Sequence, residues 1–323
     1  MAYQEEKKIG LAAVKKAAVL CQAVQTKINQ VGKIDKSDAS PVTIADFATQ
    51  ALVSQALFDV FSSIPLVGEE DASDLRADPA LCDAMMREIS AVDAGFTREK
   101  ALDAIDRGTY EGGAKGKHWV LDPIDGTKGF LRGDQYAIAL GLIEDGEVVM
   151  GVLGCPNLPN KDGTKGAIFV ASKGEGAEMF SLDGLSKGMV QVSSVSNVSE
   201  ANFCESVEKG HSSHSHSAQI ARKLGITTEP YRIDSQCKYA AVGRGDASIY
   251  LRLPTRPGYQ EKIWDHAAGV AVIIEAGGMV TDVYGRKLDF SLGRTLANNK
   301  GVIVTNGQFH EQVLVAVRDV LAL

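Results

Sequence analysis

The amino-acid sequence predicts a layered α/β protein, because helix-like and strand-like patterns both recur along its 323 residues. Apolar residues return every three or four positions from Glu5 to Ile28, which predicts a first helix, and Ala45 to Phe61 predicts a second. Two strand-like segments, Tyr136 to Ile143 and Glu147 to Leu153, flank Asp145-Gly146, a strong signal for a tight hairpin. Helices and an antiparallel sheet are therefore expected in the first half.

The rest of the first half is assigned from short patterns. Pro65 to Gly68 is apolar and precedes three acids, so we expect a strand that ends at a cleft. Residues 72–117 are charged and helix-prone, and we expect them to form a surface insertion. His118 to Leu121 and Ala167 to Ser172 are expected to be further strands of the sheet.

The second half alternates between the two patterns. We expect helices at Ser217–Leu224, Asp265–Glu275 and Gln308–Leu321, and a strand at Ala247–Leu253. The stretch from Gln191 to Ser199 has no helical period and is the candidate domain crossing. The predicted domains are residues 1–195 and 196–323.

Composition excludes several classes of protein. The 34 basic and 41 acidic residues give a net charge of −7, which argues against a broad nucleic-acid-binding surface. The longest nearly unbroken apolar run, Ala267 to Ile274, is too short for a membrane span, and the start lacks a signal peptide, so we expect a cytoplasmic protein. Five widely spaced cysteines are expected to be free thiols. The charge does not exclude a small-molecule substrate that is anionic, because a bound metal can reverse the local field, and a monomer is one possibility.

The most informative motif is Asp122-Pro123-Ile124-Asp125-Gly126-Thr127, which directly follows a predicted strand. Two carboxylates three residues apart at a strand end could face the same pair of cations, and the Ile124 carbonyl could supply another oxygen ligand. Gly126 permits close backbone approach, so that the following N–H groups can meet phosphate. The alternative is an ordinary Asp-Gly turn with two solvated acids.

Three other acids each allow two interpretations. Glu69, within Gly68-Glu69-Glu70-Asp71, belongs either to a solvated acidic run or to a ligand set, and a cation among these carboxylates would relieve their repulsion. Asp265, within Trp264–Gly269, suits a helix N-cap, which is compatible with facing a cleft. Asp46 is by position an ordinary acid of a first helical turn, so a catalytic interpretation requires a family pattern.

Four blocks together resemble the lithium-sensitive, Mg²⁺-dependent phosphatase superfamily, which includes inositol monophosphatases, inositol polyphosphate 1-phosphatases, fructose-1,6-bisphosphatases and bisphosphate nucleotidases. The blocks are Val42–Asp46, Gly68–Asp71, Trp119–Thr127 and Trp264–Gly269. Each alone is a weak motif, but their order and spacing match over nearly the whole chain. The resemblance implies a layered αβαβα sandwich of the inositol monophosphatase/fructose-1,6-bisphosphatase type, with an α+β first part and an α/β second part.

The resemblance also implies roles for individual residues. The expected Mg²⁺ ligands, for more than one ion per site, are Glu69, Asp122, the Ile124 carbonyl, Asp125 and Asp265. Thr127 and Asp46 would orient and deprotonate the attacking water. The phosphoryl oxygens would meet the metals and the N–H groups near Gly126 and Thr127. None of these positions departs from the family pattern.

Other segments are similar to the bisphosphate nucleotidases within this superfamily. These segments are Lys128–Tyr136, His211–His214, Asp234–Tyr239 and Tyr259–Ile263. The similarity implies that Ser235 and Lys238 bind a second phosphate with Arg252 assisting, and that His211 lines the nucleotide pocket; lysine suits phosphate as a point charge. Without the family, Lys238 and Arg252 would be ordinary surface charges.

The reaction expected from the resemblance is Mg²⁺-dependent hydrolysis of adenosine 3′,5′-bisphosphate to AMP and phosphate. A second expected substrate is 3′-phosphoadenylyl sulfate, and Li⁺ and Na⁺ are expected to inhibit. One alternative is a phosphatase acting on inositol 1,4-bisphosphate or an inositol monophosphate, because the hydrolytic site would be the same. An alternative of another class is a nucleotide-sensing protein without useful catalysis.

Overall fold

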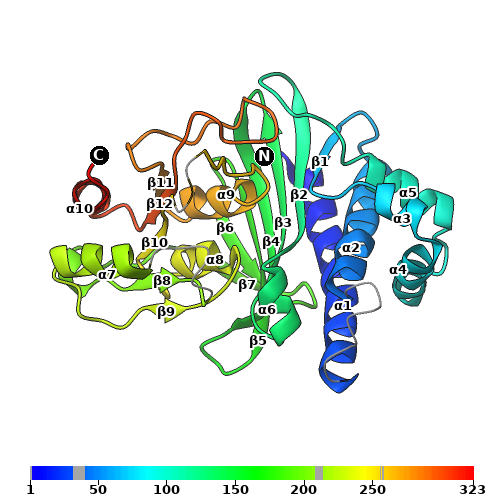
Figure 1. Ribbon diagram of the computed structural model, residues 1–323, viewed down its shortest axis with the longest axis horizontal. Helices are drawn as coiled ribbons and strands as arrows, with labels where there is room; N and C mark the ends of the chain where they lie inside the picture. The colour runs from blue at the N-terminus through cyan, green and yellow to red at the C-terminus, as the bar shows by residue number, and fades with distance from the viewer. Residues whose placement is uncertain (1, 32–40, 208–213, 255, 257) are drawn as a thin grey trace.

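Five layers of secondary structure stack in the order helix, sheet, helix, sheet, helix in the computed structural model, which describes residues 2–31, 41–207, 214–254, 256 and 258–323 (Figure 1). The first helical layer covers one face of a seven-stranded sheet. A middle pair of helices separates this sheet from a five-stranded sheet, and two further helices cover the far side. The predicted αβαβα sandwich is confirmed.

The first two layers are built from residues 4–190. Their helices are α1 (Gln4–Val31), α2 (Pro41–Phe58), α3 (Ser73–Ala77), α4 (Pro79–Val92) and α5 (Arg98–Asp106). The sheet strands are β1 (Leu66–Gly68), β2 (Lys117–Asp125), β3 (Ala137–Glu144), β4 (Glu147–Pro159), β5 (Lys165–Ser172), β6 (Gly176–Phe180) and β7 (Ser186–Val190). They lie in sequence order, with β1 parallel to β2 and the later pairs antiparallel. The short helix α6 (Thr127–Arg132) follows β2.

The remaining layers come from the second part of the chain. The second sheet has the order β11-β12-β10-β8-β9 and is of mixed direction. Its strands are β8 (Phe203–Glu205), β9 (Tyr231–Arg232), β10 (Ile249–Arg252), β11 (Met279–Thr281) and β12 (Val302–Thr305). The middle helices are α8 (Cys237–Gly243) and α9 (Ala267–Glu275), and the outer ones are α7 (His214–Lys223) and α10 (His310–Leu321). The proposed boundary after residue 195 lies between the two sheets in chain order.

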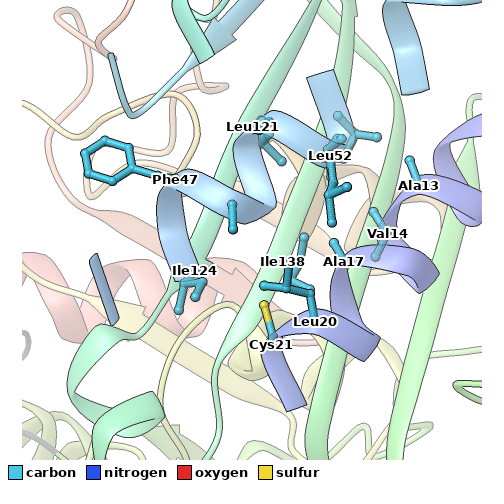
Figure 2. Packing of buried hydrophobic residues seen from close by; sticks show 14 of the residues in the cluster. Ala13, Val14, Ala17, Leu20, Cys21, Phe47, Leu52, Leu121, Ile124 and Ile138 are labelled. Carbon is cyan, nitrogen blue, oxygen red and sulfur yellow. The ribbon is translucent and has the colours of Figure 1, made fainter. Parts of the chain in front are cut away.

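Hydrophobic packing joins all five layers. One cluster fills the space between α1, α2 and the first sheet, and Figure 2 shows side chains of both helices and of strands β2 and β3 meeting there. A second cluster lies between the other face of that sheet, α8, α9 and the second sheet, and a third lies under α7 and α10. The five cysteines are buried free thiols, as expected. None of the helices in the described ranges has an apolar stretch of sufficient length to span a bilayer.

The hairpin predicted at Asp145-Gly146 is confirmed. Asp145 and Gly146 both have positive φ, at 50° and 77°, and join β3 to β4. A two-residue turn with two left-handed residues matches the right-handed twist of the strands on either side, which explains why this dipeptide is used here.

The helix-prone character expected of residues 72–117 is confirmed by α3, α4 and α5, and these helices lie on the outer side of α2 (Figure 1). Helices α4 and α5 pack against α2 and bury Met85, Ile89, Ala101 and Ile105 completely. Apolar residues at helical spacing form the buried face of α4 and α5. The many charged residues between them made this pattern hard to recognise in the sequence. The segment therefore packs through this apolar face against α2, beyond the helices that cover the sheet (Figure 1).

Small residues allow α9 to lie close against the first sheet. Gly141 on β3 and Gly151 on β4 are directly opposite each other. A Cβ atom on Gly151 would lie 2.6 Å from the Ala268 carbonyl oxygen, and one on Gly141 would lie 2.9 Å from the Ala267 Cβ. The position of the N-terminal end of α9 therefore depends on these two glycines.

We expect Gly151→Ala to destabilise the protein, because the added methyl group meets backbone atoms of α9 that cannot move without shifting the helix. Overpacking of this kind costs about 1–3 kcal/mol in the free energy of unfolding, which urea denaturation would measure. Gly95→Ala is the control, since a Cβ there would meet only an Asp93 side-chain oxygen at 3.5 Å. Equal stability of the two variants would contradict this account.

Candidate active site

A cavity of about 350 Å³ opens where the ends of β1 and β2, the start of α6, the start of α8 and the segment before α9 meet. It is the place where the first sheet and the second part of the chain contribute side chains to one space. Its walls are formed by Glu69, Asp122, Ile124, Asp125, Gly126, Thr127, Lys128, Gly129, Ser206, Asp234, Ser235, Gln236, Lys238, Tyr250, Arg252, Tyr259 and Asp265.

A bulge in β2 places two of the acids on the same side. Residues three apart in a regular strand point to opposite faces of the sheet. Asp122 is opposite Ala139, whereas Asp125 is opposite Ala137, so β2 contains one extra residue between them. Both carboxylates therefore line the cavity, while the Ile124 side chain lies in the core under α1 and α2 (Figure 2).

Glu69 reaches the same cavity from the end of β1. Strand β1 lies parallel to β2, with Gly68 beside Leu121, so Glu69 follows β1 at the level where Asp122 follows Leu121. The Glu69 carboxylate lies near enough to Asp122 to raise the pKa of that acid. The prediction that a short apolar strand delivers an acid to a cleft is confirmed for Glu69.

Gln50 on α2 holds the backbone beside Glu69. Its Nε2 donates to the Glu70 carbonyl at 2.6 Å and to the Ile105 carbonyl at 3.0 Å, and its Oε1 accepts from the Glu70 N–H at 3.1 Å. Asp46 is one helical turn earlier on the same face of α2. Since α2 begins at Pro41, Asp46 lies in the second turn, and its interpretation as a first-turn acid is wrong.

The carboxylates strongly perturb one another. Burial, with Glu69 and Asp125 nearby, raises the pKa of Asp122 well above its usual range. Burial and Asp265 raise the pKa of Asp125 to about 6. Glu69 is exposed to the cavity, but the surrounding protein atoms remove much of its hydration. This desolvation, together with the charges of Glu70 and Asp265, raises the pKa of Glu69 to about 7. These acids cannot all ionise at low cost near neutral pH without a compensating cation.

Asp46 belongs to the same electrostatic group although it does not line the cavity. Burial, together with Glu70 and Glu69, raises the pKa of Asp46 well above its usual range. Thr127, the first residue of α6, lines the cavity and is exposed. In the part of the chain that the structure describes, no hydrogen bond joins Thr127 to Asp46, so their pairing stays a prediction.

Asp265 completes the set from the opposite end of the chain. It lies one residue before His266, which is the N-cap of α9, so the N-cap interpretation of Asp265 is wrong. Arg252 donates to Asp265 at 3.0 Å and to Glu261 at 2.7 Å. The predicted contact of Arg252 with a phosphate stays a prediction, and two of its donors already hold these acids.

Glu261, Asp265 and His266 also form a compact group, with potential ligand atoms within 4.8 Å of one another. His266 Nε2 lies 3.3 Å from Glu261, and its Nδ1 lies 2.7 Å from the Tyr239 hydroxyl. The Arg252 guanidinium bridges the two acids and neutralises one of their two negative charges, so Asp265 is oriented but keeps charge that a cation in the cavity can use. We interpret this group as a support for Asp265 and not as a metal centre.

The predicted phosphate-binding residues meet around Gly126. Gly126 has φ of 91° and is the N-cap of α6, and a Cβ there would lie 2.8 Å from the Ser235 Cβ, so only glycine fits. Lys238 is 5% exposed, and its Nζ lies 5.3 Å from the centre of the Tyr250 ring. Ser235 and Lys238 therefore share the cavity with the acids, whereas His211 lies outside the described residues.

Sequence reasoning missed Gln50, Glu261 and Gln236. Gln236 donates its backbone N–H to Asp125 and its Nε2 to the Trp264 carbonyl at 2.9 Å. Buried amides and a buried acid of this kind are visible in a sequence only as polar residues beside apolar ones. Gln236 and Glu261 both lie in segments that resembled the nucleotidases, which was the available signal, whereas Gln50 had none.

Comparison with known proteins establishes the family. The model of the inositol monophosphatase family matches residues 3–322, and this chain belongs to that family. It is 45% identical to a 3′(2′),5′-bisphosphate nucleotidase of Emericella nidulans over 353 aligned residues, which cover 100% of each chain. It is 50% identical to 3′(2′),5′-bisphosphate nucleotidase 1 of Arabidopsis thaliana, over 100% of this chain and 98% of the relative. The resemblance predicted from the sequence is confirmed.

Solved structures support the same fold. The Thermotoga maritima IMPase superposes with a TM-score of 0.64 at 20% identity, covering 99% of both chains. The inositol monophosphatase from Anabaena gives a TM-score of 0.64 at 19% identity, covering 99% of this chain and 97% of that one.

The family is metal-dependent, and the residues present suit a metal ion. Five acidic residues border one cavity, namely Glu69, Asp122, Asp125, Asp234 and Asp265, and Asp122 Oδ1 is buried without a hydrogen-bond partner among the described residues. An unpaired buried carboxylate oxygen is costly, and coordination to a cation would satisfy it. All-oxygen donors are the set that hard divalent cations prefer.

The raised pKa values predict a particular pH dependence in metal-free protein. Glu69 and Asp125 bind protons more tightly in the folded chain (pKa about 7 and about 6) than in the unfolded chain (about 4.3 and 3.9), so their contribution to stability falls as pH rises through this window. In EDTA, the wild-type protein should lose more stability than Glu69→Gln between about pH 5.5 and about pH 7.5. Urea denaturation at both values measures this difference.

The matched control is Glu99→Gln, which changes an exposed acid in the first turn of α5. It should keep the wild-type pH dependence. Parallel curves for wild type and Glu69→Gln would show that the carboxylate cluster does not carry the effect.

Proposed function

We propose that this protein hydrolyses the 3′-phosphate of adenosine 3′,5′-bisphosphate, releasing AMP and inorganic phosphate in a Mg²⁺-dependent reaction. We propose 3′-phosphoadenylyl sulfate as a second substrate. The observation that carries the proposal is the convergence of Glu69, Asp122, Asp125 and Asp265 on a cavity that also contains Lys238. Full-length relatives named as bisphosphate nucleotidases support the choice of substrate.

The acids in the cavity are proposed to hold Mg²⁺, and more than one ion would fit the number of oxygen donors. The proposed ligands are Glu69, Asp122, the Ile124 carbonyl, Asp125 and Asp265. Bound Mg²⁺ would supply Lewis-acid stabilisation of the phosphoryl group and a more acidic water. Arg252 and Gln236 fix two of these carboxylates before substrate arrives, so that little reorganisation is needed.

Asp46 and Thr127 are proposed to orient the attacking water and accept its proton. Burial with Glu70 and Glu69 raises the pKa of Asp46, and a cation bound among these acids would counter that rise and keep the carboxylate ionised, as a general base must be. Thr127 lines the cavity with Asp125, which supports the proposal that its hydroxyl would contact the attacking water. The N–H groups at the start of α6 lack intrahelical partners and are available to phosphoryl oxygens.

Lys238 and Ser235 are proposed to bind the phosphate that is not cleaved, with Arg252 assisting. Burial lowers the pKa of Lys238 although Asp125 and Asp234 favour its charged form, and a phosphate beside the ammonium group would favour that form further. His211 is proposed to line the nucleotide pocket.

We expect phosphate release from adenosine 3′,5′-bisphosphate to require Mg²⁺ and to exceed release from its 2′,5′ isomer, inositol 1,4-bisphosphate, inositol 1-phosphate and fructose 1,6-bisphosphate. Asp122→Asn should lower kcat/KM by more than about 100-fold. Groups that only orient a metal ligand cost up to about that factor, and a ligand itself should cost more. Colorimetric phosphate release across this panel measures both effects.

Asp71→Asn serves as the control, because Asp71 is an exposed acid in the same run and lies outside the cavity wall. A preference for inositol 1,4-bisphosphate or inositol 1-phosphate would favour the inositol phosphatase alternative. Tight nucleotide binding without turnover would favour a sensor.

Lys238→Met should raise KM for adenosine 3′,5′-bisphosphate about 10-fold or more while sparing turnover of inositol 1-phosphate, because removing a charged hydrogen-bond partner costs about 1.5–3 kcal/mol. Lys100→Met is the matched control, since Lys100 also lies over an aromatic ring, Phe96, but far from the cavity residues in the fold. Equal losses of kcat/KM on both substrates would contradict the proposal that Lys238 binds the second phosphate.

A further inference from the structure

Arg294 binds three backbone carbonyls of the first part of the chain, although it comes from the loop between β11 and β12. Its Nη1 donates to the carbonyls of Gly108 at 3.1 Å and Tyr110 at 3.0 Å. Its Nη2 donates to the carbonyl of Gly68 at 2.5 Å. Gly68 directly precedes Glu69, so Arg294 holds the peptide unit from which this acid extends.

The same side chain contacts the segment that carries Asp265. The Arg294 guanidinium lies 4.9 Å from the centre of the Trp264 ring, and Trp264 directly precedes Asp265. The backbone reinforces this contact, since Ile263 N–H donates to the Arg294 carbonyl at 3.2 Å and Leu296 N–H donates to the Glu261 carbonyl at 2.8 Å. Arg294 therefore touches the residue before each of two acids from opposite ends of the chain.

We propose that Arg294 is a positioning residue that sets the relative placement of Glu69 and Asp265. Arg294 does not line the cavity, so it acts through these two acids and not on substrate. This inference rests on the proposed function, in which both acids hold the same Mg²⁺ site. Gln50 fixes the peptide after Glu69 and Arg294 fixes the peptide before it, so the acid is held on both sides.

The chemistry of the contact requires arginine. Three carbonyl oxygens and one aromatic face surround a single side chain, and a planar guanidinium with five donors can satisfy all of them at once. Lysine would keep the positive charge, but its ammonium group lacks the flat face and the fork that reach Gly68 and Tyr110 together. Arg294→Lys therefore separates geometry from charge.

The test measures Mg²⁺ binding directly. Isothermal titration with MgCl₂ alone would compare wild type, Arg294→Lys, Arg294→Met, Arg286→Met and Asp122→Asn. We expect both Arg294 variants to bind Mg²⁺ about 10-fold or more weakly, the range for groups that orient metal ligands. Arg286→Met should bind like wild type, because Arg286 stacks on the exposed Tyr284 away from both acids. Thermal unfolding in EDTA reports the stability of each variant separately.

Each outcome bears on a different statement. Wild-type Mg²⁺ affinity in a folded Arg294→Lys variant would overturn the positioning role, and a loss of stability alone would indicate a purely structural contact. If Arg294→Met does not fold, Arg294→Lys still decides the question. If the wild-type protein itself fails to bind Mg²⁺, or if Asp122→Asn binds it equally well, the proposed metal site fails and not the role of Arg294.

Discussion

Mutual repulsion among carboxylates held at one end of a buried strand is the constraint on which the rest of the site depends. Asp122 and Asp125 are brought to one side by a bulge in β2, and Glu69 and Asp265 approach from β1 and from the start of α9. Like charges in a partly buried cavity raise one another's pKa and would separate if they were free to move. The fold must therefore hold them by their backbones.

The holding groups lie both outside the cavity, as Gln50 and Arg294 do, and in its wall, as Gln236 and Arg252 do. Gln50 fixes the turn after Glu69, and Gln236 connects Asp125 to the segment before Asp265. Arg252, in the wall itself, is linked through Glu261 to the His266 imidazole. Such networks are strong when every member is satisfied, and they keep the acids in place without cancelling the charge that a cation needs.

The layered fold explains why these supports come from distant segments. Helix α9 can approach the first sheet only because Gly141 and Gly151 lie side by side beneath it, and this approach brings Asp265 to the end of β2. Helix α2 lies on the opposite face and brings Asp46 and Gln50 to the same edge. The site is thus built at the junction of three layers, and a change in one layer spacing would misplace several of its residues.

The sequence alone determined the layered α/β class, the Asp145-Gly146 hairpin and the acidic blocks that converge, because these depend on local periodicity, turn chemistry and motifs of recognisable spacing. It did not reveal that α4 and α5, within residues 72–117, pack an apolar face against α2, because charged side chains masked that face. Nor did it reveal the bulge in β2, which decides that two acids share one face, or the contacts of Gln50, Gln236 and Arg294. Those features depend on which backbone atoms lie opposite one another after folding, and only the tertiary structure decided that.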